Sequence, residues 1–274
     1  MSRSLVRTAA AVAGTTLAVT SAFAATAVAA PTGDGTVPSF QEFVAATFQD
    51  EDRGYVVNGD EPASTQGALR QFYDAMVAEP DTDVDGLIVN RVNGQDDKWS
   101  ANQALNLTYC VSTKFGADYS RVVTAMAAGA GQWEAATSRV NFVHVPAQDG
   151  SCTTRNSSVL FSVEPTKTTQ YIARAFFPSS SKSSRNVLVN ANSLYTSGSW
   201  TPSNILAHEL GHTLGFRHEH TRPEAGTCFE DNNWRSLTPY DSASIMHYPQ
   251  CNGSSDDLSM TDQDRAGVRT LYGS

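Results

Sequence analysis

Residues 208–218 have the sequence HELGHTLGFRH, and this stretch decides the fold of the chain. On a helix, His208 and His212 lie one turn apart and point the same way, so both imidazoles can reach one metal ion. Gly215 accepts the left-handed backbone conformation that ends a helix, and a turn there allows His218 to come back as a third ligand. Three protein ligands leave one position of a zinc ion open, as in catalytic zinc sites. The stretch therefore predicts a catalytic Zn²⁺ site.

Glu209 is the candidate general base of this site. It follows the first histidine and lies too far round the helix to be a fourth ligand, but close enough to act on a water molecule beside the metal. The alternative is a histidine-rich surface helix without a metal. The combined spacing of the histidines, the glutamate and the glycine makes that alternative the weaker one.

Residues 1–30 have the features of a secretory signal peptide. Arg3 and Arg7 supply the positive start, and Ala9–Val19 form a short apolar stretch that small-residue cleavage sites follow. A membrane anchor is the alternative, but the apolar run is short and interrupted. We therefore expect a secreted, extracellular protein without membrane association after signal cleavage.

The cysteines fit an oxidising compartment. The chain has four of them, an even number, and none forms a Cys-x-x-Cys pair that would indicate a structural zinc site. Two disulfides are expected, and three pairings are possible. We favour the pairing in which each bridge closes a local loop, namely Cys110–Cys152 and Cys228–Cys251.

The net charge of −9 is concentrated in residues 31–98, whereas residues 99–274 are nearly neutral. The two segments are therefore interpreted as a propeptide and a catalytic domain. Neither carries the basic patches of a nucleic-acid-binding protein, so no nucleic-acid partner is expected. Asp81–Gly86 resembles the first half of a calcium-binding loop, but the glutamate due at the twelfth position is missing, which favours an acidic linker.

The pattern of apolar residues predicts an α+β fold for the catalytic domain. A long helix is expected over 119–138, where apolar residues recur at helical spacing. Thr201 and Pro202 begin the zinc helix as N-cap and first helical residue. Strands are expected over 105–112, 140–145, 158–163, 171–177 and 186–194, followed by a loop over 222–257 and a last helix over 261–272. In the propeptide, helices are expected over 39–47 and 65–78, separated by a turn region over 54–62.

Residues 208–218 match the long zinc signature of the metzincin metallopeptidases. The continuation through residues 215–223 resembles astacins and related secreted bacterial enzymes, and Ser244–Tyr248 resembles the methionine turn of that group. The resemblance implies a metzincin-like zincin domain, with a twisted mixed sheet, a long helix and the zinc helix, preceded by a small propeptide. It also implies that the substrate lies extended along a sheet edge, placed at residues 171–177.

The resemblance implies individual roles for the residues of these motifs. His208, His212 and His218 would bind Zn²⁺, Glu209 would be the general base, and Tyr248 would be a fifth ligand or a hydrogen-bond donor to the transition state. Met246 would lie beneath the metal, and Glu219 would contact the trimmed N-terminus of the mature enzyme. His220 and His247 are interpreted as structural or solvated residues and His144 as a surface residue. Arg217 and Arg222 are interpreted as salt-bridge partners.

The predicted function is a secreted zinc endopeptidase, made as a zymogen and acting as a monomer on proteins or peptides bound in extended form. Two alternatives stay open: a catalytically silent binding domain that keeps the zinc, and a zinc hydrolase acting on a non-protein amide such as one in a cell wall. Residues 1–109 lack cysteine, so latency through a propeptide thiolate is excluded. Astacin propeptides use the aspartate of a Phe-x-Gly-Asp motif, and here Val57–Asp60 keeps Gly-Asp without the aromatic residue. Asp60 is therefore a candidate blocking carboxylate, and a simple Asn-Gly turn is the alternative.

Overall fold

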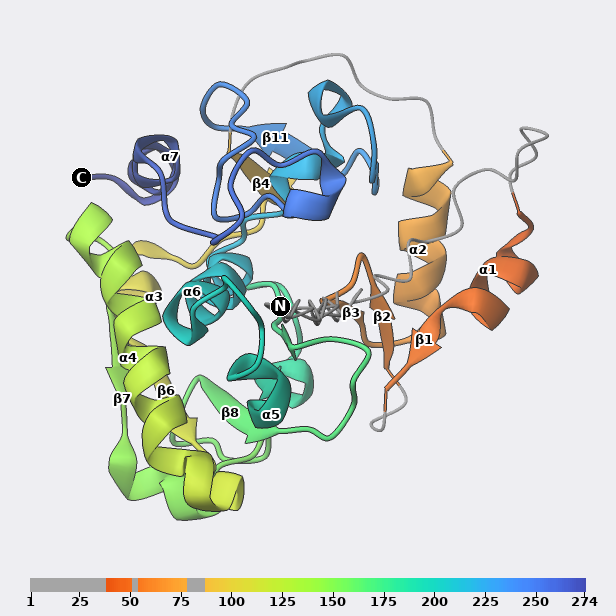
Figure 1. Cartoon of the computed structure of the whole chain (residues 1–274). Coiled ribbons are helices and arrows are strands. Elements are labelled where there is room, and N and C mark those ends of the chain that lie inside the picture. Colours follow the sequence, from red (N-terminus) through yellow and green to blue (C-terminus); the bar gives the residue numbers. More distant parts are fainter. Residues whose placement is uncertain (1–37, 51–53, 78–86) are drawn as a thin grey trace, which may run out of the picture.

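The computed structural model describes residues 38–50, 54–77 and 87–274, in two parts that differ in size (Figure 1). We call residues 38–77 the N-terminal part and residues 87–274 the main part. The predicted signal peptide and the calcium-like run at 81–86 lie outside the described residues. Within the described ranges, none of the helices has the length and apolarity needed to cross a bilayer.

The N-terminal part is a small α+β unit beside the main part (Figure 1). Its elements are α1 (Phe40–Ala46), β1 (Phe48–Gln49), β2 (Tyr55–Val57), β3 (Glu61–Ala63) and α2 (Gln66–Met76), with the strands in the antiparallel order β1-β2-β3. Asn58 and Gly59 both have positive φ, which is the two-residue turn that Asn-Gly favours between antiparallel strands. The two predicted helices are confirmed. The strands on either side of the turn were not predicted because each is only three residues long.

The main part is built on a five-stranded sheet of order β7-β6-β8-β10-β9. Its strands are β6 (Leu107–Val111), β7 (Phe142–His144), β8 (Phe161–Pro165), β9 (Ala173–Arg174) and β10 (Asn186–Val189). Four strands are parallel, and β9 pairs antiparallel with β10 at one edge. All five overlap predicted strands, but β9 is much shorter than predicted and β8 begins three residues later. The strand predicted over 186–194 ends at Val189, and its second half is instead the helix α5 (Ala191–Leu194), which Asn190 caps. The mixed sheet confirms the predicted fold class.

Helices α4 (Tyr119–Ala136) and α6 (Pro202–Thr213) lie side by side within this part (Figure 1). Gly129 allows the close approach, because a Cβ atom there would lie 2.8 Å from the backbone nitrogen of Ala207. Trp133 donates from its indole to the carbonyl of Ala207 at 2.8 Å. The remaining α-helices of the main part are α3 (Ala101–Ala104), α5 (Ala191–Leu194) and α7 (Asp262–Tyr272). The predicted long helix, α6 and α7 are therefore confirmed.

A small antiparallel sheet, β11-β4-β5, joins the start of the main part to its C-terminal half. It consists of β4 (Ile88–Val92), β5 (Gln95–Asp96) and β11 (Trp234–Ser236). Leu87 and Val89 belong to the same buried core as helix α6. Residues 87–98 thus pack with the rest of the main part, although the acidic composition of residues 31–98 as a whole placed them in the predicted propeptide. The composition of a segment does not indicate whether it pairs, as a strand, with another segment that lies far along the chain.

Six short 3₁₀-helices complete the described elements. They are η1 (Thr113–Asp118), η2 (Pro146–Ser151), η3 (Lys182–Ser184), η4 (Glu219–Thr221), η5 (Pro223–Ala225) and η6 (Pro249–Cys251). Two of them, η5 and η6, and strand β11 occupy residues 222–257, which were predicted as a loop. This stretch has little regular structure but forms one side of the site described below.

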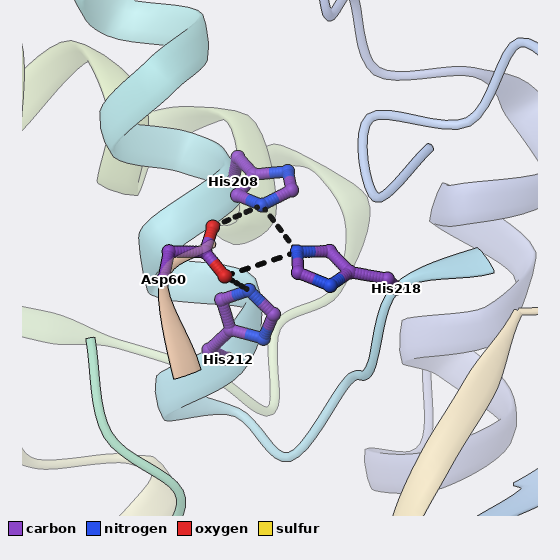
Figure 2. Close-up of side chains that lie close together, drawn as sticks. All are labelled: Asp60, His208, His212 and His218. Carbon is purple, nitrogen blue, oxygen red and sulfur yellow. Dashed lines mark hydrogen bonds and ion pairs between the residues drawn. The ribbon is translucent and has the colours of Figure 1, made fainter. Parts of the chain in front are cut away.

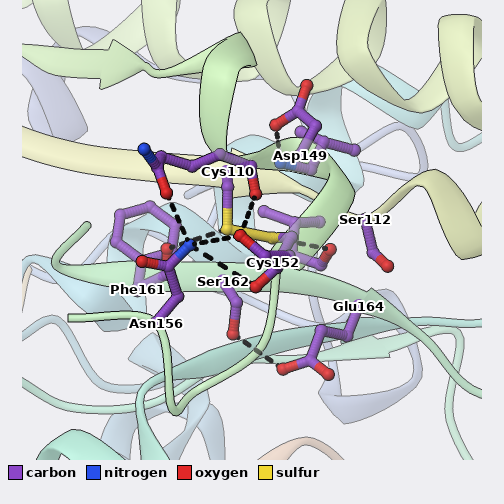
Figure 3. Close-up of a disulfide and its surroundings, with 12 residues drawn as sticks. Cys110, Ser112, Asp149, Cys152, Asn156, Phe161, Ser162 and Glu164 are labelled. Carbon is purple, nitrogen blue, oxygen red and sulfur yellow. Dashed lines mark hydrogen bonds between the residues drawn. A yellow bond between two sulfur atoms is a disulfide. The ribbon is translucent and has the colours of Figure 1, made fainter. Parts of the chain in front are cut away.

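Both favoured disulfides are present. Cys110 and Cys152 tie β6 to the segment after η2, where they are surrounded by Phe161, Asn156 and Ser162 (Figure 3). Cys228 and Cys251 join the two ends of the irregular stretch after α6. Each bridge closes a loop within the main part, which restricts the unfolded chain and so stabilises the fold.

Candidate active site

Three histidines converge at the C-terminal end of α6 (Figure 2). His208 and His212 project from successive turns of the helix, and His218 comes from the chain that follows the turn at Gly215. The Nε2 atoms of His208 and His218 are 3.2 Å apart. All three imidazoles are almost completely buried. The structure therefore brings together the three residues that were predicted to bind a metal.

The outer nitrogen of each imidazole has a defined partner. Nδ1 of His208 donates to the carbonyl of Ile245 at 2.7 Å, and Nδ1 of His212 donates to the carbonyl of Phe216 at 2.8 Å. Nδ1 of His218 lies 2.7 Å from a carboxylate oxygen of Glu230. These acceptors place the hydrogen on Nδ1, so in the neutral rings the Nε2 lone pairs point inward.

This donor set fits a divalent metal such as Zn²⁺. Inward lone pairs of three histidines face one another and the carboxylate of Asp60, and the four candidate ligand atoms lie within 4.8 Å of one another. Among the described residues, Nε2 of His212 and Oδ1 of Asp60 have no hydrogen-bond partner, although they are 3.5 Å apart. Burial opposes a charged imidazole, yet Asp60 and Glu230 hold the pKa of His218 well above its usual value. Imidazole nitrogens together with a carboxylate are ligands that suit zinc.

The turn at Gly215 directs the chain from α6 to His218. Gly215 has a φ of 101°, and a Cβ atom there would lie 2.1 Å from the carbonyl oxygen of Asp97. Strand β4 holds both sides of the turn, because Asn90 donates its N–H to Gly215 and Arg217 donates its N–H to Ile88. The position of His218 therefore depends on residues more than a hundred positions earlier in the chain.

Glu209 lies beside the histidines with a carboxylate oxygen available. Its side chain is buried, and within the part of the chain that the structure describes its Oε2 atom has no hydrogen-bond partner. It lines a cavity of about 70 Å³ together with His208, Tyr248 and the apolar side chains of Trp200, Ile205 and Leu258. Burial, with the nearby charge of Asp60, raises the pKa of Glu209 well above its usual value. A carboxylate with a raised pKa is suited to accept and return a proton near neutral pH.

Met246 and Tyr248 belong to the segment that was predicted to form the methionine turn. The ring of Tyr248 stacks on that of His208 with centroids 5.3 Å apart, and its hydroxyl donates to Asp60. Met246 is fully buried against the last turn of α6, where a Cβ atom on Gly211 would lie 2.5 Å from its sulfur. Met246 thus supports the helix through packing.

The methionine turn is anchored by Asp264 of α7, which sequence reasoning did not identify. Asp264 accepts from the Ser244 hydroxyl at 2.5 Å and from the N–H of Ile245 at 2.9 Å. It also completes the capping box of α7 with Thr261. The capping pattern was visible in the sequence as a helix start, but its contact with the turn depends on tertiary structure.

Asp60 of the N-terminal part lies in the middle of the histidine cluster (Figure 2). Its carboxylate oxygens are 3.1 Å from Nε2 of His208 and 3.1 Å from Nε2 of His218. Although burial opposes ionisation, His218 and His212 hold the pKa of Asp60 well below its usual value. The Asn-Gly turn and the contact of Asp60 with the histidines were considered as alternatives, but both are present, because the turn directs Asp60 toward the cluster.

A second group of acidic residues supports His218 from behind. Glu230 contacts His218, the Nε2 atom of His220 at 3.2 Å and the guanidinium of Arg217 at 3.1 Å. Arg217 also forms two 2.8 Å hydrogen bonds to Asp231. Glu230 and Asp231 lie outside the zinc signature at 208–218, so no motif in the sequence indicated this role.

Arg217 extends this group into the N-terminal part. It lies 3.2 Å from a carboxylate oxygen of Glu61, the residue after Asp60. Burial raises the pKa of Glu61 to about 8. Arg217 was interpreted as a salt-bridge residue, and its ion pairs confirm this interpretation.

The other residues singled out in the sequence, Glu219 and the histidines at 220, 247 and 144, contact neighbouring protein groups. Glu219 is buried, accepts from the N–H of Asp241 at 3.1 Å and pairs with Arg222 at 3.4 Å. His220 accepts from the N–H of Tyr248. His247 contacts the hydroxyl of Tyr240, and His144 contacts the carboxylate of Asp149.

Comparison with known proteins agrees with this geometry. The model of metallo-peptidase family M12 matches residues 86–259, which include the three histidines, Glu209 and Tyr248. The match covers more than half of the chain, so the chain belongs to metallo-peptidase family M12. The predicted metzincin relationship is confirmed.

The relatives found by sequence are astacin-like enzymes. Zinc metalloproteinase nas-30 of Caenorhabditis elegans is 40% identical over a stretch covering 16% of this chain and 8% of that protein. High choriolytic enzymes 2 and 1 of Oryzias latipes are each 38% identical over 17% of this chain and 22% and 23% of their own lengths. The chain thus spans less than a quarter of the length of these curated relatives.

Proposed function

We propose that this protein is a secreted zinc endopeptidase made as a zymogen, with His208, His212 and His218 as zinc ligands. The observation that carries the proposal is the convergence of three oriented Nε2 atoms beside an available Glu209 carboxylate. Membership of a metallopeptidase family supports the same chemistry. The names of the relatives support zinc as the metal.

Zn²⁺ held by His208, His212 and His218 would supply the Lewis-acid chemistry that polarises a scissile carbonyl and lowers the pKa of a water molecule. Glu209 takes the proton from the attacking water and passes it to the leaving amine. The hydroxyl of Tyr248 donates a hydrogen bond to the oxyanion that develops on the peptide, once it no longer donates to Asp60. The Nδ1 partners of the histidines keep the three rings in their ligating orientation.

The substrate is proposed to lie extended along β9, at the edge of the five-stranded sheet. Ala173 of this strand lines the same cavity as Glu209 and His208, which brings the edge to the reacting groups. An extended peptide bound here would place its backbone across the histidine cluster. The presence of Glu209 argues against a catalytically silent binding domain. A substrate screen distinguishes an endopeptidase from a hydrolase that acts on non-protein amides.

Latency is proposed to come from Asp60. Its carboxylate contacts all three histidines and Tyr248, so it occupies the place where water and substrate must bind. We further propose that residues 1–30 form the signal peptide and that the propeptide ends within residues 78–86. The packing of Leu87 and Val89 in the core supports this earlier boundary over one at Lys98.

The test compares peptide cleavage by the activated wild type and by Glu209→Ala, with zinc content measured on both. We expect equal zinc, and a loss of kcat in the variant of about 10²- to 10⁴-fold, the range for a general acid–base group. Glu224→Gln serves as a control, because it removes a partly exposed carboxylate of the nearby η5 segment. Equal zinc with no cleavage of any protein or peptide by the wild type would contradict the endopeptidase assignment.

A further inference from the structure

The segment that follows the proposed zinc ligand His218 contacts the methionine turn at two points. Glu219 donates its N–H to the carbonyl of Met246 at 2.8 Å, and Tyr248 donates its N–H to Nδ1 of His220 at 3.2 Å. His220 is 2% exposed, and its ring stacks on that of Tyr248 with centroids 5.1 Å apart. His220 therefore contacts both the backbone and the ring of the tyrosine that is proposed to stabilise the oxyanion.

The carboxylate of Glu230 joins His220 to the proposed zinc ligand. One of its oxygens lies 3.2 Å from Nε2 of His220 and 2.7 Å from Nδ1 of His218. The other oxygen accepts from Arg217 at 3.1 Å. The rings of His218 and His220 are also stacked, with centroids 4.6 Å apart. One buried carboxylate thus contacts two neighbouring imidazoles, of which the first faces the metal position and the second faces Tyr248.

A second metal site is the alternative interpretation of His218, His220 and Glu230, whose candidate ligand atoms lie within 4.8 Å of one another. The hydrogen bonds argue against it. A backbone N–H can only donate, so Nδ1 of His220, which accepts from Tyr248, carries no hydrogen, and Nε2 carries it. His218 carries its hydrogen on Nδ1 when its Nε2 lone pair faces the metal position. Both nitrogens that face Glu230 are therefore donors, and the carboxylate fixes the orientation of two rings.

The disulfide between Cys228 and Cys251 holds together the two segments that contact His220. Glu230 follows Cys228 by two positions in the sequence. Tyr248 precedes Cys251 by three positions on the other segment. All of these residues belong to the main part, so the contacts of His220 with them do not depend on the presence of the N-terminal part.

We infer that His220 is a positioning residue of the active site: Glu230 fixes its ring, and its Nδ1 atom holds the backbone of Tyr248 so that the phenol hydroxyl can reach the oxyanion. The inference rests on the proposed function and gives a role to a histidine that is not one of the three proposed zinc ligands. The imidazole acts through Tyr248 and is not itself a catalytic residue. A misplacement of about 1 Å at a reacting group can lower the rate considerably, so a fixed backbone at Tyr248 matters for kcat.

The experiment compares two substitutions that keep different halves of the hydrogen bonding of His220. In His220→Asn the amide oxygen can replace Nδ1 and accept from Tyr248, whereas in His220→Gln the amide nitrogen can replace Nε2 and donate to Glu230. The full chain is folded, loaded with zinc and activated by limited proteolysis, and kcat, KM and the zinc dissociation constant are measured. We expect His220→Gln to lower kcat by about threefold to tenfold, the range for one hydrogen bond, with little change in KM or zinc affinity. His220→Asn should keep kcat within about twofold of the wild type.

Tyr248→Phe determines whether His220 acts through the phenol hydroxyl. In this background His220→Gln should leave kcat unchanged, because the group that it positions is already absent. The control is His144→Gln, which makes the same change at a histidine of strand β7 that contacts Asp149. This control should leave kcat unchanged with or without the tyrosine hydroxyl.

The outcomes separate the inference from the proposed function. The inference alone is overturned if His220→Gln has the kcat of the wild type, if its loss persists in Tyr248→Phe, if His220→Asn loses as much, or if zinc affinity falls in parallel with kcat. Absence of peptide cleavage by the zinc-loaded wild type overturns the proposed function and the inference with it. Unfolding midpoints verify the fold of each variant. If His220→Gln does not fold, His220→Leu replaces it: a kcat loss that disappears in Tyr248→Phe supports the inference, and one that persists overturns it.

Discussion

The main part and the N-terminal part of this protein are stabilised in different ways. The main part has a large continuous core, built from the sheet, α4 and α6, and two disulfides. The N-terminal part has a core of only four buried residues, Phe43, Val57, Ala63 and Leu69. Its contacts with the main part include three acidic residues, Asp50, Asp60 and Glu61, that face arginines and histidines.

Under the latency proposed above, this difference explains how a protein can hold an inhibitory segment in place and still release it after cleavage. Burial of apolar side chains stabilises the main part whether or not the N-terminal part is attached. A buried ion pair, in contrast, needs both partners to be present. Once the N-terminal part is cut away, its small core gives it little stability of its own. The Nε2 atoms of the three histidines that Asp60 contacts are then available to a metal ion.

The largest expected effect is on the main part, from Gly215→Ala. The added Cβ atom would lie 2.1 Å from the backbone of Asp97, and the φ of 101° disfavours any other residue. We expect a loss of about 3 kcal/mol or more in the free energy of unfolding, together with weaker zinc binding. Denaturant unfolding and zinc titration measure both.

Gly131→Ala is the matched control for that variant. A Cβ atom there meets no atom within 4 Å, and the residue lies inside α4. The helix propensity of alanine should stabilise the protein by up to about 1 kcal/mol. If both substitutions have the same sign, the role assigned to the Gly215 turn is wrong.

The next effect concerns Tyr248, which connects the two parts. In the activated chain, Tyr248→Phe should lower kcat by about tenfold to a thousandfold, because one donor to the transition state is lost. Zinc affinity should change much less. Steady-state kinetics and metal titration measure the two quantities, and a variant with unchanged kcat would remove Tyr248 from the mechanism.

The smallest effect is expected in the N-terminal part, from Phe43→Ala. Phe43 is buried between α1 and α2, where its ring lies 6.1 Å from that of Phe72. Truncation should destabilise this small cluster by about 2 kcal/mol, the transfer free energy of one buried apolar side chain, and leave the core of the main part unchanged. Hydrogen exchange resolves the two parts: faster exchange confined to residues 38–77 is expected, and equal acceleration in α4 would contradict the separation.

Much of the site could be predicted from the sequence because its signals are local. The spacing of His208, His212 and His218 is set by one helix and one turn, and the disulfides close loops of moderate length. The roles of Glu230 and Asp264 could not be predicted, since each depends on contacts with a separate segment of the chain. Strand β4 was missed although Asn93 and Gly94 form a local turn to β5, because β5 is only two residues long and the other partners, β11 and the chain after Gly215, are distant in sequence.

The most direct measurement of the central claim is peptide cleavage by the unprocessed Asp60→Ala precursor, with its intact mass verified. Asp60 contacts all three histidines, so its removal should give a precursor that cleaves peptides before processing, while the wild-type precursor does not. Asp74→Ala, which changes an exposed carboxylate on α2, should stay as silent as the wild type. An Asp60→Ala precursor that is folded, uncut and no more active than the wild type would contradict the claim that this carboxylate keeps the site latent.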